Sequence, residues 1–140
     1  MRLQPLQALV ADIELKKIPS IIKERNRNAQ YLDANLAVLG TKIVIPMRNS
    51  YDVETYSLYM ILCERRDELL EYLQRKRIDA KVHYPVPLHL QEAAKELGYG
   101  KGSFPVTESQ ASTVITLPAH QFLDVSQLDY MVASIKEFYS

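Results

Sequence analysis

The chain has 140 residues, of which 47% are hydrophobic, so it is long enough and apolar enough to form one domain with a real core. Lys and Arg together number 17, as do Asp and Glu, and the formal net charge is zero. A protein that neutralises several phosphates of a nucleic acid needs a surplus of basic residues, so this balance argues against nucleic acid as a partner.

The first forty residues are predicted to be helical, in two pieces. Apolar residues recur every three or four positions over 3–18, and Pro5 is tolerated because it falls in the first turn. Pro19 ends this helix and can open the next one, which runs to Gly40, a suitable C-terminal cap. We therefore divide the chain into a helical arm, 1–39, and a second part, 40–140. An arm without a core of its own must pack on this domain, on another domain or on a second chain.

Beyond Gly40 the pattern changes to short β-branched runs and amphipathic segments. The run 53–63 is apolar on both faces, which is typical of a central strand. The order of elements predicts an α+β two-layer sandwich, in which a small mixed or antiparallel sheet has helices on one face and is preceded by a long two-part helical arm. We expect strands over 41–46, 53–63, 78–85 and 114–120, and helices over 64–77, 88–100, 104–114 and 124–139.

The single cysteine, Cys63, cannot form an internal disulfide. It lies in the apolar run YSLYMILC, where a buried, inert thiol is favoured over a nucleophile. Asp12 and Glu14 interrupt any secretion signal, and no stretch is long and apolar enough to cross a membrane. We therefore expect a cytoplasmic protein with no membrane partner.

Several kinds of site are disfavoured by the residues present. His83 and His89 are six residues apart, His120 is distant, and no cysteine completes a ligand set, so we expect no metal. No serine lies in a G-x-S-x-G elbow. The segment GYGKG, 98–102, superficially resembles a phosphate-binding loop, but it follows a helix and is interpreted as a helix stop and loop.

The segment HYPVPLH, 83–89, holds the strongest candidate site. Pro85 and Pro87 fix φ and remove two backbone donors, so the chain is expected to leave the sheet as a stiff extended segment. While still in the strand, His83 and Tyr84 should point to opposite faces. They offer an imidazole and a phenol, which suit sugar hydroxyls or phosphate oxygens. The residues alone leave open whether the pair is the rim of a binding pocket or the satisfied edge of a core.

Longer motifs add a resemblance to this reading. HYPxPLHxQ, then GY, then FPxxE, then a strand ending in LP follow one another within residues 67–120. The opening RLQPLQALVADIELKKI, 2–18, is similar to a helix of the form N-x-R-[ML]-x-x-[LI]-Q-A-A, beginning just after the asparagine. Both resemble the C-terminal part of the DegT/DnrJ/EryC1/StrS family, and the resemblance covers essentially the whole chain. These are pyridoxal-phosphate-dependent aminotransferases of the aspartate aminotransferase superfamily that act on nucleotide-linked keto-sugars.

The resemblance implies that the chain is the small C-terminal domain of a fold type I aminotransferase, without the large cofactor-binding domain. In the family, the lysine that holds the cofactor lies ahead of the N-x-R helix, and none of the nine lysines here matches it. We therefore expect no catalytic residue, no pyridoxal phosphate bound by this chain alone, and no activity. The arm, 1–39, would join the large and small domains and contribute to a homodimer.

Three positions carry over from the family as substrate-binding residues. Arg2 matches the family arginine, and His83 and Tyr84 match the HYP pair. In the family these groups reach across the dimer interface toward the neighbouring subunit's sugar nucleotide, chiefly its phosphates, and an arginine fork with neutral donors suits that task. Two departures could alter the substrate range: Arg77 stands where the family usually has glycine, and Ser57 stands where it often has histidine.

The leading hypothesis is therefore the C-terminal domain of an enzyme that transfers an amino group from glutamate or glutamine to a nucleotide-linked keto-sugar, in cell-surface polysaccharide or amino-sugar biosynthesis. Two alternatives stay open. The chain could be a naturally truncated, non-enzymatic module that dimerises or binds a sugar nucleotide, or a fragment of a family member that performs dehydration.

Overall fold

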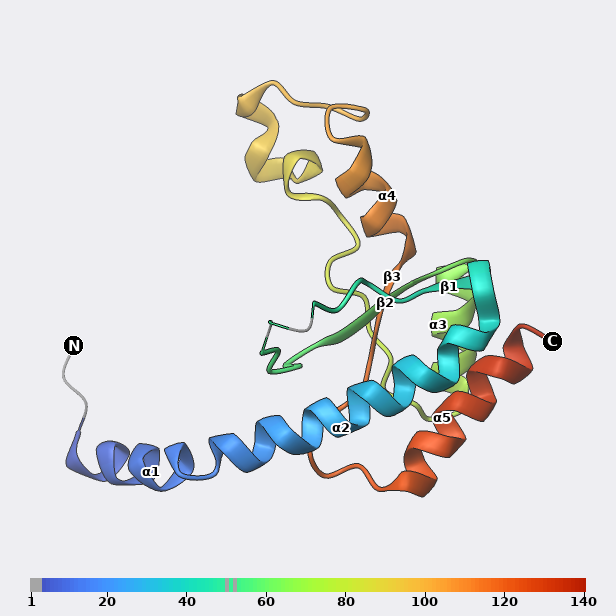
Figure 1. Ribbon diagram of the computed structural model, residues 1–140. Coiled ribbons are helices and arrows are strands. Elements are labelled where there is room, and N and C mark those ends of the chain that lie inside the picture. The colour runs from blue at the N-terminus through green and yellow to red at the C-terminus, as the bar shows by residue number, and fades with distance from the viewer. Residues whose placement is uncertain (1–3, 50, 52) are drawn as a thin grey trace.

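A computed structural model describes residues 4–49, 51 and 53–140. Its three strands form one antiparallel sheet in the order β1-β2-β3, which confirms the predicted α+β class and the central place of β2 (Figure 1). The elements are α1 (Pro5–Leu15), α2 (Ile18–Leu36), β1 (Ile43–Val44), β2 (Tyr59–Cys63), α3 (Arg66–Arg75), α4 (Pro105–Thr113), β3 (Val114–Leu117) and α5 (Val125–Phe138), with 3-10 turns η1 (Ala37–Lys42), η2 (Leu88–Leu90) and η3 (Glu92–Leu97).

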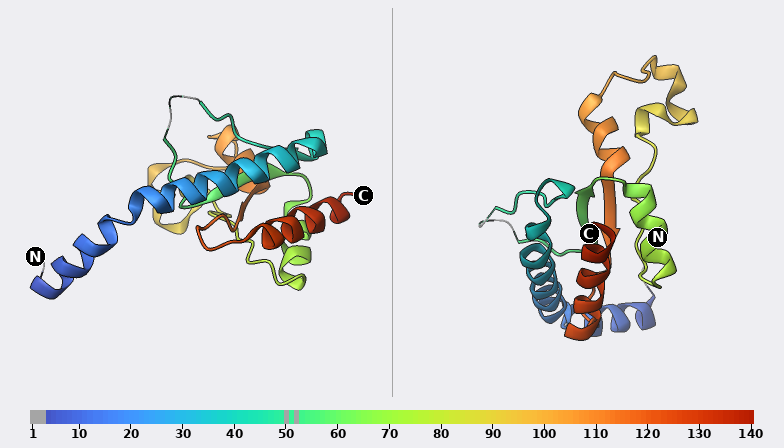
Figure 2. Two further views of the ribbon diagram at one scale, coloured as in Figure 1. Left: turned by 60° about the horizontal axis from the view of Figure 1, so that its bottom comes forward. Right: turned by 90° about the vertical axis from the view of Figure 1, so that its right-hand side faces the viewer.

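The core lies between one face of the sheet and the helices α2, α3 and α5 (Figures 1 and 2). Alternate residues of β2 are buried on this face, as the two-residue period of a strand requires. Each fully buried leucine or isoleucine contributes about 1.5–3 kcal/mol relative to an exposed one. The fully buried leucines and isoleucines are Leu32 and Leu36 of α2, Leu69 and Leu73 of α3, Leu128 and Ile135 of α5, and Ile61 and Ile115 of the sheet.

Helix α5 begins where its sequence predicts. Asp124 is the N-cap, and its Oδ1 accepts a hydrogen bond of 2.8 Å from the backbone N–H of Gln127. The opposite end of the molecule differs, because no residue of α1 is buried. Figure 1 shows α1 in line with α2 and extending past the body of the molecule. Its apolar stripe, the exposed residues Leu6, Leu9, Val10 and Ile13, contacts no core.

The predicted strand 78–85 is wrong in extent. Helix α3 ends in a Schellman motif, in which the N–H of Ile78 bonds the carbonyl of Leu73 and the N–H of Arg77 bonds that of Gln74, each at 2.9 Å. Ile78 therefore belongs to the end of α3, although it was expected to begin the strand. Only one isolated bridge, between Lys81 and Thr116, joins this segment to β3.

Other predicted elements are present but shorter. Tyr56 has φ of 43°, a left-handed conformation that interrupts the expected strand 53–63, so β2 starts only at Tyr59. The expected strand 41–46 is reduced to β1. The expected helix 88–100 consists of η2 and η3, neither of which contributes a residue to the hydrophobic core. Packing against a core is the main stabiliser of a helix, and this segment lacks it.

The segment between the Lys81 bridge and α4 projects from the sheet, on the side away from α2 and α5 (Figures 1 and 2). It holds the HYPVPLH motif and returns to the sheet through α4, which begins at Pro105 as expected. Among the described helices, none combines the length and apolar character that a membrane span needs.

Candidate functional site

His83 is held at the edge of the sheet by β3. The backbone N–H and C=O of Thr116 bond the C=O and N–H of Lys81 at 2.7 and 3.0 Å. Two residues further on, Nδ1 of His83 lies 3.1 Å from Oγ1 of Thr116, a hydroxyl on a residue that is only 6% exposed. The imidazole is therefore anchored through one nitrogen, and its Nε2 has no hydrogen-bond partner within the described ranges.

Tyr84 projects into solvent beside this ring. It is 74% exposed, and its ring meets that of His83 edge-on, with centroids 5.8 Å apart and planes at 86°. The peptide bond between the two residues is cis. The expectation that the side chains point to opposite faces of a strand is thus wrong, because both rings lie together on a segment outside the sheet.

An apolar groove of about 480 Å³ opens next to the two rings. Its floor is the outer face of β2, where Met60 and Leu62 alternate with the buried core residues. One wall is the stiff segment 84–88, and the other is α4, which contributes Thr107 and Gln110. This explains why β2 is apolar on both faces although helices α2, α3 and α5 cover only one of them.

A smaller, polar hollow of about 240 Å³ also includes His83 and Thr116 in its lining. Arg25 of α2, Lys81 and His120 contribute cationic or ionisable groups to it. Lys81 is paired with Asp79 at 2.8 Å, and Arg25 donates from Nε to Gln121 at 3.1 Å. His83 thus separates an apolar groove from a more polar hollow that holds Asp79 as well as basic groups, a combination that suits a ligand with both a ring and a polar part.

His89 and Glu108 hold the projecting segment in shape. His89 is almost fully buried, with Nε2 3.0 Å from Oε1 of Glu108, and its ring packs edge-on against Phe104. Glu108 also accepts the backbone N–H of Gly102 at 2.8 Å, and this bond, together with His89, lowers the pKa of the carboxyl group. The pairing brings together the PLHxQ and FPxxE motifs. Sequence reasoning missed it, although the two motifs were the available signal.

Away from His83, Asp33 of α2 bonds the start of β2 and the loop that precedes it. It accepts the phenol of Tyr59 at 2.7 Å and an N–H of Arg48 at 3.3 Å. The guanidinium also lies over the ring of Tyr56, 5.2 Å from its centroid. Burial, and then the hydrogen bond to Asp33, raise the pKa of Tyr59. This network is structural, since it satisfies its own polar groups.

Cys63 is buried, as expected from its apolar run. Burial raises the pKa of the thiol to about 11, so the reactive thiolate is disfavoured at neutral pH. Within the part of the chain that the structure describes, no three His, Cys, Asp or Glu side chains gather to hold a metal ion.

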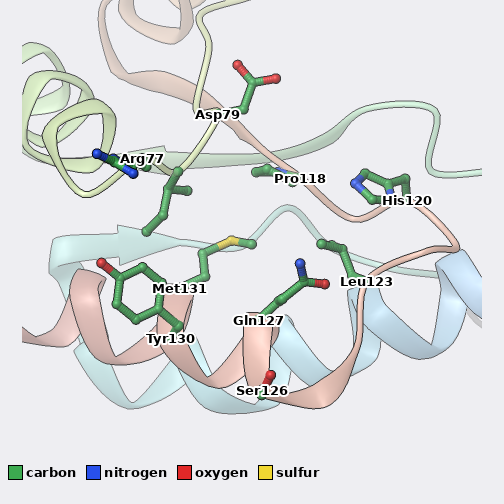
Figure 3. Close-up of a pocket in the computed structure, with 10 residues that line it drawn as sticks. Arg77, Asp79, Pro118, His120, Leu123, Ser126, Gln127, Tyr130 and Met131 are labelled. Atoms are coloured by element: carbon green, nitrogen blue, oxygen red, sulfur yellow. The ribbon is translucent and has the colours of Figure 1, made fainter.

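A further hollow of about 440 Å³ lies between α5 and the loops that follow α3 and β3 (Figure 3). Met131 and Leu123 give it an apolar floor, while Arg77 and Asp79 point away from its centre in Figure 3. His120 and Gln127 also line it, but Nδ1 of His120 already accepts the backbone N–H of Phe122, and Oε1 of Gln127 that of Asp124, which leaves fewer free groups to fix a ligand. The groove and hollow around His83 are the better candidate site.

The lysines of the chain do not fit a Schiff base with pyridoxal phosphate. All nine are described, and none is buried. Lys81 is the one that lines a hollow described above, but its ammonium group is paired with Asp79. Arg2, the third predicted substrate-binding residue, lies outside the described residues, so only His83 and Tyr84 can be placed.

Comparisons with known proteins agree on one family. Residues 1–136 match the model of the DegT/DnrJ/EryC1/StrS aminotransferase family. The chain is 33% identical over 140 residues to dTDP-3-amino-3,4,6-trideoxy-alpha-D-glucose transaminase of Streptomyces venezuelae, covering 98% of this chain and 36% of that protein. The curated relatives are longer, and the chain spans a little over a third of their length.

Solved structures show the same relation. The crystal structure of S. venezuelae DesV with a ketimine intermediate superposes with a TM-score of 0.90 at 32% identity, covering 96% of this chain and 36% of that one. Spr1654 of Streptococcus pneumoniae, a putative sugar aminotransferase with structures titled PLP-form and PMP-form, gives a TM-score of 0.80 at 26% identity, over 91% of this chain and 33% of its own.

Proposed function

Because the chain belongs to the DegT/DnrJ/EryC1/StrS aminotransferase family, we propose that it is the C-terminal portion of an enzyme that transfers an amino group from glutamate or glutamine to a nucleotide-linked keto-sugar. The observation that carries the proposal is the family match, which runs over residues 1–136. The S. venezuelae relative is named for a transaminase of a dTDP-linked sugar, which supports a nucleotide-linked substrate. A cytoplasmic location and amino-sugar or polysaccharide biosynthesis accompany this proposal.

In this proposal the chain supplies one rim of the substrate site. The exposed phenol of Tyr84 and Nε2 of His83, which has no partner among the described residues, bind anionic oxygens of the nucleotide sugar. The guanidinium of Arg2 adds a further pair of donors. The rim serves the active site of a neighbouring subunit in a homodimer. Residues 1–39 act as the arm between a larger domain and the small domain, 40–140.

The cofactor chemistry belongs to the part of the family's length that this chain does not span. Pyridoxal phosphate provides the electron sink of a transaminase, and no lysine here fits it. We therefore expect no absorbance change when pyridoxal phosphate is added to this chain. Mass spectrometry after borohydride reduction should find no lysine adduct. A trapped adduct together with transaminase turnover would overturn this part of the proposal.

The substrate rim is tested by adding UDP-glucose or dTDP to the ¹⁵N-labelled chain. We expect shift changes centred on residues 81–86, with a dissociation constant on the order of 1 mM, because half of the pocket is missing. His83→Ala and Tyr84→Phe should weaken these changes. Tyr99→Phe is the matched control, since it removes an exposed phenol from outside the groove and the hollow. Shift changes centred elsewhere, or none at about 10 mM ligand, would refute the rim.

One observation favours a second candidate function, a non-enzymatic module that dimerises. The apolar stripe of α1 is exposed along its whole length. Apolar faces of this kind mark interaction surfaces in soluble proteins. Light scattering tests this second candidate: a module built for dimerisation forms a dimer over a wide concentration range, and a monomer at high concentration contradicts it.

A further inference from the structure

We propose that Thr116 is a positioning residue that fixes the tautomer of His83, so that the imidazole presents an N–H at Nε2 to its ligand. This inference rests on the proposed function for its ligand, an anionic oxygen of a nucleotide sugar. The tautomer itself is a property of the free chain and is tested without any ligand.

The first step concerns the rigidity of Thr116. Its backbone is bonded on one side to Lys81, at 2.7 and 3.0 Å, and is paired on the other with Met60 of β2. The residue is 6% exposed and sits in the interior of β3. The backbone that carries the hydroxyl is therefore held in place, and β-branching restricts χ1 of threonine. It is therefore a better anchor for a ring than a side chain on a loop.

The second step assigns the proton. The hydroxyl of Thr116 is both a donor and an acceptor, and Nδ1 of His83, at 3.1 Å, is its partner among the described residues. If Nδ1 donated to this oxygen, the hydroxyl hydrogen would have no acceptor on a buried residue. If the hydroxyl donates to Nδ1, both the hydroxyl hydrogen and Nδ1 have a partner. A neutral imidazole that accepts at Nδ1 carries its proton at Nε2.

The third step concerns what the free nitrogen can do. Nε2 has no partner within the described residues, and the ring borders both the apolar groove and the hollow lined by Arg25 and Lys81. An N–H at this position donates to an anionic oxygen, whereas a bare nitrogen would repel it. The tautomer thus decides whether His83 assists or opposes an anionic ligand.

Nuclear magnetic resonance reads the tautomer directly. Long-range ¹H–¹⁵N correlations of the labelled chain, at about pH 8.5 where an imidazole is neutral, show which ring nitrogen is protonated. His120 provides an internal reference, because its Nδ1 accepts the backbone N–H of Phe122 and its proton must lie at Nε2. The loss of one signal set in His83→Gln assigns His83.

We expect His83 to share the pattern of His120 in the wild-type chain and in Thr116→Ser, which keeps the hydroxyl. In Thr116→Val, which keeps the shape, His83 should shift toward the average of both tautomers. Thr113→Val is the control, because the hydroxyl of Thr113 bonds a carbonyl of α4 and not a histidine. Its His83 signals should match the wild type.

Two results overturn the proposal: a proton on Nδ1 of His83 in the wild-type chain, or Thr116→Val signals identical to those of the wild type. The dispersion of the amide signals shows whether Thr116→Val folds. If it does not fold, the tautomer of His83 in the wild-type chain still tests the proposal. A chain that binds no nucleotide but shows the expected tautomer would refute the rim and leave this inference standing. Nucleotide binding at residues 81–86 together with the opposite tautomer would refute this inference and leave the substrate rim standing.

Discussion

Arg77 occupies a backbone conformation that suits glycine, and replacing it should stabilise the protein. It is the residue after the C-cap of α3, with φ of 59°, and its N–H and that of Ile78 close the Schellman motif at 2.9 Å. The sequence resemblance places a glycine at this position, so the turn keeps the glycine conformation with an arginine in it. The side chain is exposed and forms no ion pair or hydrogen bond with a described residue.

The magnitude follows from two opposing terms. A non-glycine residue in the left-handed region costs about 1–2 kcal/mol because Cβ approaches the following carbonyl. Glycine adds freedom to the unfolded chain, which costs about 0.4–1 kcal/mol. We expect Arg77→Gly to raise the free energy of unfolding by about 0.5–1 kcal/mol. For a chain of this size that corresponds to a rise in Tm of roughly 1–4 °C.

Urea unfolding followed by circular dichroism measures the change. Arg77→Ala separates the backbone from the side chain, since it loses the cation near the helix C-terminus but keeps Cβ, and it should be less stable than Arg77→Gly. Arg75→Gly, two residues earlier at the last helical position of α3, should instead lower the free energy of unfolding, by up to about 1 kcal/mol. The reasoning fails if Arg77→Gly is less stable than Arg77→Ala, or if both glycine variants destabilise equally.

Three further predictions concern separate parts of the fold. The pKa of Glu108 is lowered, so the stability that its contacts contribute is present above the ordinary pKa of 4.5 and is lost as the pH falls through the lower folded-state pKa. The amide signal of Gly102, which bonds this carboxylate, should therefore titrate below pH 4.5, and Glu108→Gln should abolish the titration. A midpoint above 4.5 contradicts this. Tyr59→Phe removes the hydrogen bond to the carboxylate of Asp33 and should lower the free energy of urea unfolding by about 1.5–3 kcal/mol, whereas Tyr99→Phe should leave it unchanged. Leu9→Glu on α1 should change that free energy by no more than about 0.5 kcal/mol, since Leu9 is exposed, and a larger loss would show that α1 packs on this chain.

The features that could be predicted from sequence are those dictated by periodicity and local caps. Helix α5 follows from its apolar spacing and from Asp124, and the central position of β2 follows from its two apolar faces. The break between α1 and α2 falls where Pro19 requires it. Each of these depends on residues close together in the chain, so a window of the sequence contains the information.

The parts that could not be predicted depend on distant partners. The segment 78–85 has an apolar strand pattern, but the Schellman turn at Arg77 engages Ile78, and only Lys81 of this segment pairs with β3. The contact of His83 with Thr116 joins residues 33 positions apart, and that of His89 with Glu108 joins residues 19 apart. No local pattern reports such pairs. The family motifs marked three of these four residues without saying which would meet.

The segment that carries the candidate site takes no part in the hydrophobic core. The core cluster includes Ala80 and resumes at Ile115, and no residue between them, all of which are described, belongs to it. The ends of this segment are fixed by the Lys81 bridge and by Arg66, whose guanidinium donates to the carbonyls of Ala111 and Val114 at 3.1 Å. Substitutions at exposed positions between those two points should therefore leave the free energy of unfolding of the core almost unchanged, so the binding surface can be altered separately from the part that stabilises the fold.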